Sequence, residues 1–239
     1  MKLEELIKTG LENKPPRILL YGTHGIGKSR FAAMSPSPIF IPTEDGLTTI
    51  DVPRFPLAQS LDNVWEYMGK LISENHQYQT VIMDTIDWLE NLIWKEVCKT
   101  GQKEKIEDFG YGKGYNNALI YWDKFINGLD KLREKGMAIL LIAHSEIKIY
   151  NPPDNEPYDR YQIKLHQKAA AKLEEWVDAV LFLHKKVYVD NKKAVEGETV
   201  LFTDSCPAWR AKNRYGFPKE IPYNFNNLLT LIKGEKTNG

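Results

Sequence analysis

The sequence predicts an α/β domain with a mostly parallel central sheet and helices on both faces. Short apolar runs, typical of buried strands, alternate along the chain with longer segments of helical periodicity. One such run, at 18–21, leads directly into residues 22–29, Gly-Thr-His-Gly-Ile-Gly-Lys-Ser. This matches the G-x-x-x-x-G-K-[ST] phosphate-binding loop in the strand-then-helix context that the pattern requires. At 239 residues the chain is long enough for one such domain.

The first half of the chain follows this alternation, with proline and serine at the boundaries. Apolar residues at helical spacing precede Pro15 and Pro16, Ser-Pro pairs end the second helix, and Ser60 is a good N-cap for the third. The expected elements are an amphipathic helix at 1–14, a strand at 17–21, a helix at 29–34, a strand at 39–44, a helix at 60–75 and a strand at 80–84.

The second half predicts further helices and strands separated by polar segments. Gly136 is placed to end a long helix, and proline interrupts the polar stretch at 146–161. The expected order is a Trp- and Leu-rich helix at 88–97, a glycine-tyrosine loop at 109–115, a helix to 135, a strand at 138–143, a polar segment at 146–161, a helix ending near 176, and strands at 179–214 with a charged turn at 190–198. We expect one domain, with its core at 17–216 and a tail at 217–239.

Composition limits the classes of protein to which the chain can belong. Lys plus Arg and Asp plus Glu number 32 each, which excludes a strongly basic nucleic-acid binder but allows a local basic patch. Cys98 and Cys206 form neither a disulfide framework nor a closely spaced metal-ligand pair. No window reaches the apolar length of a membrane span, and the N-terminus lacks the apolar segment of a signal peptide. We expect a protein of a reducing cytoplasm, with no membrane contact.

The phosphate loop predicts binding of ATP with Mg²⁺. Its glycines let backbone N–H groups surround a phosphate, Lys28 is expected to reach the β- and γ-phosphates, and the Ser29 hydroxyl to ligate Mg²⁺. The alternative interpretation of this motif is a glycine turn before a helix, with no role in nucleotide binding. The residues expected to contact the nucleotide are Gly22, Thr23, His24, Gly25, Ile26, Gly27, Lys28, Ser29 and Arg30.

A second acid for the magnesium ion is expected at the end of another strand. Asp84 closes the apolar run 81–83, as the Walker B acid does, and would hold Mg²⁺ through water. Its alternative role is to cap the helix that starts at Thr85, and the two roles are compatible. Asp87 is expected to be a helix cap, with a reserve acid as the alternative.

Several motifs resemble those of RecA-like ATPases, and in particular phage nucleotide-binding ATPases of single-strand annealing and recombination. Besides the phosphate loop, the resemblance lies in residues 84–88, 108–115 and 211–216. It implies that Glu44, which ends the strand after the phosphate-loop helix, activates the attacking water. Typical AAA+ proteins place that glutamate beside the Walker B acid, where this chain has Thr85. His144 would sense the γ-phosphate and signal to a DNA-contacting loop.

The resemblance also implies an assembly with shared sites. Lys212 and Arg214 resemble the Lys-x-Arg element that related proteins insert into a neighbour's ATP site, which implies a ring or filament of identical subunits with ATP at the interfaces. The alternatives are a basic edge strand for these two residues, a solvated turn residue for Glu44 and a satisfied polar residue for His144.

Two segments correspond in position to the DNA-facing loops of RecA-like proteins, at 109–115 and 146–165. Stacking rings interleaved with cations suit a sequence-tolerant single-strand site. Acidic residues in the second segment cancel its positive charge, so a surface loop with packed tyrosines stays an alternative. The candidate DNA-binding residues are Tyr111, Lys113, Tyr115, Lys148, Tyr158, Arg160, Tyr161 and Lys164.

The sequence therefore predicts a DNA-stimulated ATPase that acts on single-stranded DNA in phage recombination or annealing, in the cytoplasm of a bacterial host. A single-strand-binding protein is a further expected partner. One alternative is a nucleotide-controlled replication accessory or helicase-loading factor with little turnover. Another is a small-molecule P-loop kinase, which generally needs an arginine-rich lid, although residues 101–114 contain no arginine.

Overall fold

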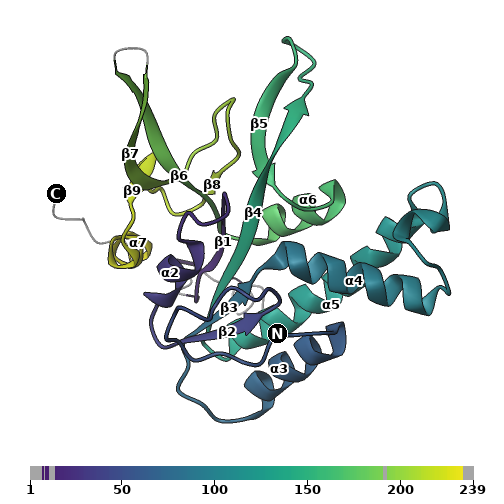
Figure 1. The fold of residues 1–239 in the computed structure, drawn as a ribbon. Helices are drawn as coiled ribbons and strands as arrows, with labels where there is room; N and C mark the ends of the chain where they lie inside the picture. Colours follow the sequence, from purple (N-terminus) through teal and green to yellow (C-terminus); the bar gives the residue numbers. More distant parts are fainter. Residues whose placement is uncertain (1–6, 8, 11–13, 191–192, 234–239) are drawn as a thin grey trace.

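The computed structural model has a nine-stranded sheet as its centre, seen edge-on between the helices in Figure 1. It describes residues 7, 9–10, 14–190 and 193–233, so the helix expected at 1–14 lies almost wholly outside the described residues. The strands are β1 (Arg17–Gly22), β2 (Pro38–Pro42), β3 (Thr80–Asp84), β4 (Ala138–Tyr150), β5 (Tyr158–Ile163), β6 (Ala179–Asp190), β7 (Lys193–Phe202), β8 (Lys212–Asn213) and β9 (Glu220–Pro222).

Strand order places the phosphate-loop strand in the middle of the sheet. The order is β2-β3-β4-β1-β6-β7-β9, with β5 paired to β4 and β8 to β6. The first five strands of this order run parallel, whereas β7, β8 and β9 pair antiparallel. The strand that ends in Asp84 is thus separated from β1 by β4. The predicted α/β fold class, with a mostly parallel central sheet, is confirmed.

Helices cover both faces, as predicted. They are α2 (Lys28–Ala33), α3 (Leu61–Ser73), α4 (Ile86–Thr100), α5 (Lys113–Glu134), α6 (Gln167–Trp176) and α7 (Phe225–Ile232), with a 3₁₀ turn η1 (Ile106–Phe109). None of the helices in the described ranges is long and apolar enough to cross a membrane.

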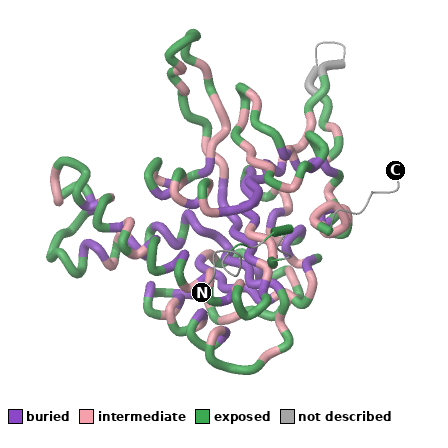
Figure 2. The backbone as a smooth tube through the Cα atoms, turned by 180° about the vertical axis from the view of Figure 1, so that it is seen from behind, coloured by how far each residue is buried: buried purple, intermediate pink, exposed green. Residues whose placement is uncertain are grey.

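Successive side chains along the parallel strands point to opposite faces of the sheet, which divides the core into two layers. On β1, Leu19 and Tyr21 point into the layer built with α3, α4, α5 and α6, while Ile18 and Leu20 point into the layer built with α2 and α7. Both sets are buried because both faces of a parallel sheet are covered. Figure 2 shows the buried residues gathered in the central body and the exposed ones along the projections.

Two hairpins project from the carboxyl-end side of the sheet (Figure 1). The polar segment expected at 146–161 is instead largely strand: β4 continues to Tyr150 and returns as β5, because polar and apolar residues alternate through it. The charged turn expected at 190–198 is also shorter than predicted, since β7 already begins at Lys193.

The C-terminal region continues the core where the sequence predicts a tail. β9 pairs with β7, and α7 packs beside α2. Phe217, Ile221, Phe225 and Leu228 are buried in the same layer as β1 residues Ile18 and Leu20. These residues bring the loop between β9 and α7 next to the phosphate loop, which matters for the site below.

Candidate functional site

A cleft of about 590 Å³ opens where the carboxyl ends of β1, β2, β3 and β4 meet. Parallel strands bring segments far apart in sequence to one edge, which is where open α/β sheets bind ligands. The cleft is lined by residues 24–30 of the phosphate loop and by Glu44, Gly46, Thr49, Ile50, Asp84, Thr85, His144, Thr199 and Tyr223. The predicted Lys28, Ser29, Glu44, Asp84 and His144 thus come together from four elements.

The glycines of the phosphate loop are required by geometry. Gly25 and Gly27 have φ of 72° and 104°, which is the left-handed region that favours glycine. A Cβ atom at Gly22 would lie 2.4 Å from the Leu183 carbonyl oxygen, and one at Gly27 2.7 Å from the Tyr223 hydroxyl. These positions therefore require glycine, as expected in a loop whose backbone surrounds a phosphate.

Lys28 is buried, and its amine donates hydrogen bonds to the carbonyl oxygens of Gly22 (3.2 Å) and Thr23 (2.9 Å). Burial lowers the pKa of Lys28, while the carboxylates of Asp84, Asp87 and Glu44 act in the opposite direction. The amine is held within the loop that a triphosphate would occupy, so a short side-chain movement would bring it onto the phosphates.

Asp84 and Ser29 supply the oxygen ligands that Mg²⁺ prefers. Asp84 is buried at the end of β3, and the Ser29 hydroxyl donates a hydrogen bond to its carboxylate. Desolvation raises the pKa of Asp84 to about 6, with Glu44 adding to the rise and Ser29 and Lys28 opposing it. A carboxylate and a hydroxyl in contact beside a phosphate loop fit a magnesium site; the ion would neutralise phosphate charge there.

Glu44 lies two residues beyond β2, and its backbone is tied to the end of β3. Thr43 N–H donates to the Asp84 carbonyl oxygen at 2.8 Å, and the Thr85 hydroxyl donates to Glu44 Oε2 at 3.4 Å. The Glu44 side chain keeps 27% of its surface exposed. It therefore faces the cleft as a partly solvated carboxylate, which is a suitable position for a group that orients a water molecule.

His144 is buried at the sheet edge and is held by Asp87. The Asp87 carboxylate accepts from His144 backbone N–H at 3.0 Å and lies 2.9 Å from ring Nδ1. Burial raises the pKa of Asp87, but its hydrogen bonds and charge interactions with His144 outweigh this and lower it. The expectation that Asp87 caps a helix is wrong: Thr85 occupies the N-cap position of α4, and Asp87 lies in its first turn.

The predicted phosphate-loop residue His24 stacks on His144, with ring centroids 3.7 Å apart and 19° between the planes. His24, Glu44 and His144 each offer a ligand atom, and these atoms lie within 4.8 Å of one another. Near-parallel rings direct their nitrogens side by side rather than toward one point, so we assign no metal centre to them. The stack instead links the phosphate loop to the end of the buried part of β4.

The Lys-x-Arg run lies away from the cleft and is engaged within the same chain. Lys212 donates to the carbonyl oxygens of Glu174, Glu175 and Val177, at 2.6, 3.0 and 2.7 Å, and so caps the carboxyl end of α6. Lys212 is therefore not a free finger residue in this structure. Arg214 donates to the Glu175 carbonyl oxygen but stays 53% exposed, so its predicted role in a neighbour's site stays a prediction.

Most of the DNA-binding candidates lie on one side of the β4–β5 hairpin or near its base. Lys148 and Arg160 are directly opposite each other across β4 and β5. Tyr161, by contrast, points to the other face, where its ring lies 5.2 Å from Phe182 and 5.5 Å from His184. Tyr161 is therefore a packing residue, and the alternation of a strand is the reason.

The other candidates divide between an exposed tip and the hairpin base. Tyr111 is fully exposed at the α4–α5 turn, and Lys113 begins α5. Tyr115 lies further along α5, where its ring stacks on His166 with centroids 4.1 Å apart. Lys164 lies on the chain between β5 and α6. Tyr158 is paired with Tyr150 on the hairpin itself.

Sequence reasoning missed Tyr223, whose hydroxyl donates to the Gly27 carbonyl oxygen at 2.7 Å. Tyr223 and Gly27 are 196 positions apart, and nothing in the local pattern connects them. Only the packing of β9 and α7 on the core places this tyrosine at the phosphate loop.

A family model described as an AAA domain matches residues 14–215. The SPbeta prophage-derived uncharacterized protein YorG of Bacillus subtilis (strain 168) is 28% identical over 150 residues, which cover 59% of this chain and 43% of that protein. The chain thus spans less than half the length of this curated relative.

Two solved structures are similar at low identity. The flagellar accessory protein FlaH from Methanocaldococcus jannaschii has a TM-score of 0.45 at 9% identity, covering 87% of this chain and 84% of that one. The RadB recombinase has a TM-score of 0.46 at 12% identity, covering 79% and 80%. Because the AAA domain model matches well over half of the chain, around a phosphate loop whose partner residues meet in one cleft, the protein belongs to this AAA domain family.

Proposed function

We propose that this protein hydrolyses ATP at the cleft and couples the reaction to single-stranded DNA bound on the β4–β5 hairpin. Lys28 would neutralise the β- and γ-phosphates, and Ser29 and Asp84 would hold Mg²⁺, which supplies charge neutralisation at the transferring group. Glu44 would orient the attacking water from its place beside Thr85, next to Asp84. His144, clamped by Asp87, would report whether the γ-phosphate position is filled.

The observation that carries the proposal is the continuity of β4 from the cleft into the hairpin. His144 lies at the cleft and bonds to Asp87, and the next residue, Ser145, already pairs with Ile163 of β5. A displacement of His144 would therefore reach the hairpin through one peptide bond. This gives a nucleotide site a direct mechanical connection to an exposed surface.

One face of the hairpin has the chemistry of a single-strand site. Lys148, Tyr150, Tyr158 and Arg160 share this face, and the Arg160 guanidinium lies 3.7 Å from the Tyr150 ring centroid. Arg160 Nε is buried and has no hydrogen-bond partner among the described residues. The face borders a cavity of about 550 Å³ that Arg210 also lines. Rings and guanidinium groups of this kind stack bases and contact phosphates.

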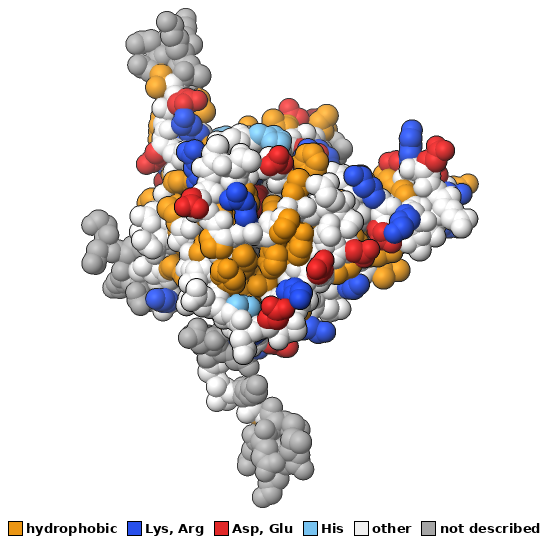
Figure 3. Space-filling view, turned by 60° about the horizontal axis from the view of Figure 1, so that its bottom comes forward, with side chains coloured by type: hydrophobic (Ala, Val, Ile, Leu, Met, Phe, Trp, Pro, Cys, Tyr) orange, Lys and Arg blue, Asp and Glu red, His pale blue; other side chains and the backbone are white. Residues whose placement is uncertain are grey.

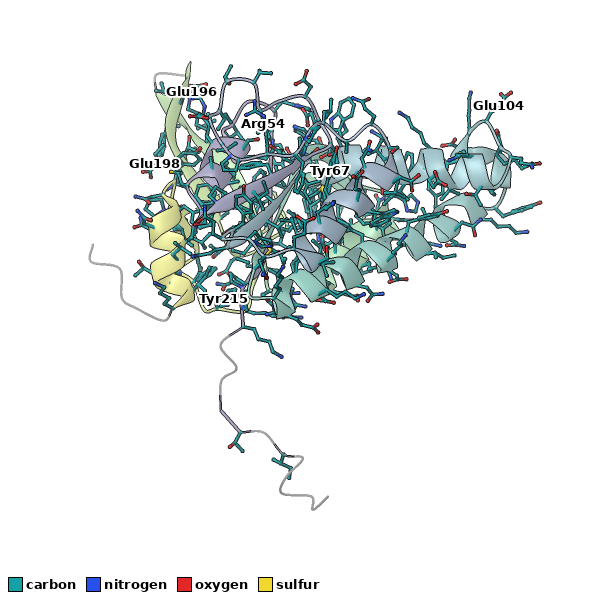
Figure 4. All side chains as sticks on the ribbon, turned by 90° about the horizontal axis from the view of Figure 1, so that it is seen from below. Arg54, Tyr67, Glu104, Glu196, Glu198 and Tyr215 are labelled. Atoms are coloured by element: carbon teal, nitrogen blue, oxygen red, sulfur yellow. The ribbon has the colours of Figure 1, made fainter. Side chains whose placement is uncertain are left out.

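Lys148 is paired with Glu146 on the β4–β5 hairpin, and the lysines of the β6–β7 hairpin are paired with acids as well. On the β6–β7 hairpin, Lys185 pairs with Glu196, and Lys186 pairs with Glu198 and Glu220. Figure 4 shows Glu196 and Glu198 on the opposite side of the body from Glu104, which marks the α4–α5 tip. On the face in Figure 3, Lys and Arg are interspersed with Asp and Glu around a hydrophobic centre. These surfaces offer no extended phosphate-binding patch.

The similarity to a prophage-derived protein supports a phage context for the activity. We propose a role in phage recombination or single-strand annealing in a bacterial cytoplasm, as a ring or filament with ATP at subunit interfaces. A single-strand-binding protein would be a further partner, since it occupies the same substrate.

The test is the ATPase rate with and without a single-stranded oligonucleotide. We expect stimulation in the wild type, a loss of about 10²-fold or more in kcat for Glu44→Gln and Lys28→Ala, and no change in the matched surface variants Glu104→Gln and Lys103→Ala. Glu44→Gln should keep its affinity for ATP. A rate that is lost in Lys28→Ala but indifferent to DNA in the wild type would overturn the coupling to single-stranded DNA.

A second candidate function is a nucleotide-controlled accessory or helicase-loading factor with little turnover. It is favoured by Lys28, whose amine lines the cleft but is bonded to two carbonyl oxygens of its own loop. This candidate predicts tight ATP binding with negligible hydrolysis that Glu44→Gln leaves unchanged.

A further inference from the structure

A second groove, of about 370 Å³, lies between α4 and the base of the β4–β5 hairpin. Its lining includes Trp88 and Trp94 from α4, Lys148 from β4, and Lys164 and His166 from the segment that leads into α6. Neither Trp88, Trp94 nor His166 is among the DNA-binding residues that the sequence predicts. Trp88 directly follows Asp87, the residue that holds His144, so the groove adjoins the nucleotide cleft.

The groove presents aromatic faces that are already held in place. Trp94 meets the edge of Tyr115 at a centroid distance of 5.5 Å, and Tyr115 stacks on His166 with only 5° between the planes. The Tyr115 hydroxyl donates to Glu107 at 2.7 Å, which fixes this ring. Trp88 stays 46% exposed although it is a large aromatic residue on a helix. Exposed indole beside ordered rings is a surface on which a planar group can stack.

The charges in the groove favour bases over phosphates. Lys148 is paired with Glu146 at 2.6 Å, and the Asp87 carboxylate lies 2.9 Å from the His144 ring on the side of the nucleotide cleft. Glu90, in the floor of the groove, accepts a hydrogen bond from His166 N–H at 2.9 Å. Carboxylates repel phosphate but accept hydrogen bonds from base N–H groups. The Arg160 guanidinium, which suits phosphates, lies in the neighbouring cavity, where Arg210 is paired with Glu174 at 2.6 Å.

The two cavities are adjacent, since Lys148, Leu165 and His166 line both. A strand whose phosphates lie along Arg160 could turn its bases across the hairpin base toward Trp88. Sequence-tolerant single-strand sites combine a cationic groove for the backbone with aromatic rings on which the bases stack.

We propose that this groove is the base-binding subsite of the single-strand site, with Trp88 as its exposed stacking platform and Trp94 and His166 as its inner wall. The inference rests on the proposed function, since it assumes that single-stranded DNA is the client. It also places a DNA-contacting side chain next to the residue that clamps His144.

The experiment is a titration of the full chain with two 20-residue oligonucleotides, oligo(dT) and a matched strand of abasic sites. Binding is followed by tryptophan fluorescence and by anisotropy of a labelled oligonucleotide. Oligo(dT) should quench the fluorescence, whereas the abasic strand should bind more weakly and without quenching. Trp88→Ala should weaken oligo(dT) binding about 5- to 150-fold, the range expected for one stacked base. Trp65→Ala, on the distant helix α3, is the matched control.

Trp88→Phe guards against a folding defect, because it keeps a stacking ring but removes the indole signal. It should bind oligo(dT) nearly as well as the wild type with reduced quenching. If the wild type binds oligo(dT) but Trp88→Ala binds it equally well, or the abasic strand binds as tightly, the subsite is overturned while the proposed function stands. If the wild type binds no single-stranded DNA, the proposed function itself fails, and the subsite with it.

Discussion

The Asp87 carboxylate holds His144 at two points, accepting from its backbone N–H at 3.0 Å and lying 2.9 Å from its ring Nδ1. Both residues are almost fully buried, so the contact is shielded from water. It joins the first turn of α4 to the end of the buried part of β4. The clamp thus lies between the nucleotide cleft on one side and the groove with Trp88 on the other.

Asp87→Asn should weaken this clamp, because an amide keeps the shape but loses the charge. We expect the free energy of unfolding at pH 7 to fall by about 1.5–3 kcal/mol, as measured by urea denaturation. Stimulation of the ATPase by single-stranded DNA should fall with it. Asp62→Asn is the matched control, since Asp62 occupies the same position in the first turn of α3 but is exposed. Equal effects of the two substitutions would contradict a special role for Asp87.

Glu90 should make the stability of the protein fall as pH rises. Burial raises the pKa of Glu90 from 4.5 to about 7, with the His166 N–H bond opposing the rise. When the pKa of an acid is higher in the folded than in the unfolded state, the protein is most stable at a pH below the unfolded-state pKa. The free energy of unfolding then falls as the pH rises from 4.5 to 7. This fall in the free energy of unfolding is about 3 kcal/mol at most, and Glu90→Gln should abolish it.

The measurement is urea unfolding of wild type and Glu90→Gln at several pH values between 4.5 and 8. Glu104→Gln, at the exposed tip of the α4–α5 turn, should follow the wild-type curve. Parallel curves for the wild type and Glu90→Gln would show that Glu90 ionises normally in the folded protein.

Asp178 should be among the most sensitive positions for stability. It bonds the backbone and guanidinium of Arg17, at 3.1 and 2.7 Å, and pairs with Arg133 and Arg214. Burial raises the pKa of Asp178, but its interactions with Arg17 and then Arg133 lower it overall. Asp178→Ala would leave these cations without their carboxylate, at a cost of about 3–5 kcal/mol in unfolding free energy. Glu74→Ala, which removes an exposed partner of Lys70, should leave the free energy of unfolding close to that of the wild type.

Tyr223→Phe should alter nucleotide affinity without changing the cleft's charge. The substitution removes the 2.7 Å hydrogen bond from the Tyr223 hydroxyl to the Gly27 carbonyl oxygen and so loosens the phosphate loop. The bond is worth about 0.5–1.5 kcal/mol, which corresponds to roughly a 2- to 10-fold weaker Kd for a fluorescent ATP analogue. Tyr188→Phe, on the exposed β6–β7 hairpin, should leave the Kd unchanged. An unchanged Kd in Tyr223→Phe would mean that the loop holds its shape unaided.

A subunit-mixing experiment tests whether Arg214 acts in a neighbour's site. Glu44→Gln and Arg214→Ala should each be inactive alone, whereas a mixture should regain activity if one subunit supplies Glu44 and another supplies Arg214 to a composite site. Sedimentation with ATP would show the accompanying assembly. A mixture that stays inactive would assign Arg214 to its contacts with Asp178 and Glu175 within one chain.

The sequence by itself determined the phosphate loop, the strand-end acid Asp84 and the alternation of buried strands and helices. These features are local: each depends on residue types within a few positions of one another, so pattern and propensity are sufficient. The approach of Glu44, Asp84 and His144 also followed from the sequence, because parallel strands bring their carboxyl ends to one edge.

Tertiary structure alone decided which side chains those local features would meet. The bond from Asp87 to His144, the capping of α6 by Lys212 and the contact of Tyr223 with Gly27 all join segments that are distant in sequence. The β4–β5 hairpin likewise separated Tyr161 from Arg160, since a strand directs neighbouring residues to opposite faces. Such pairings depend on how whole elements pack, and packing is set by the summed burial of many residues rather than by any one motif.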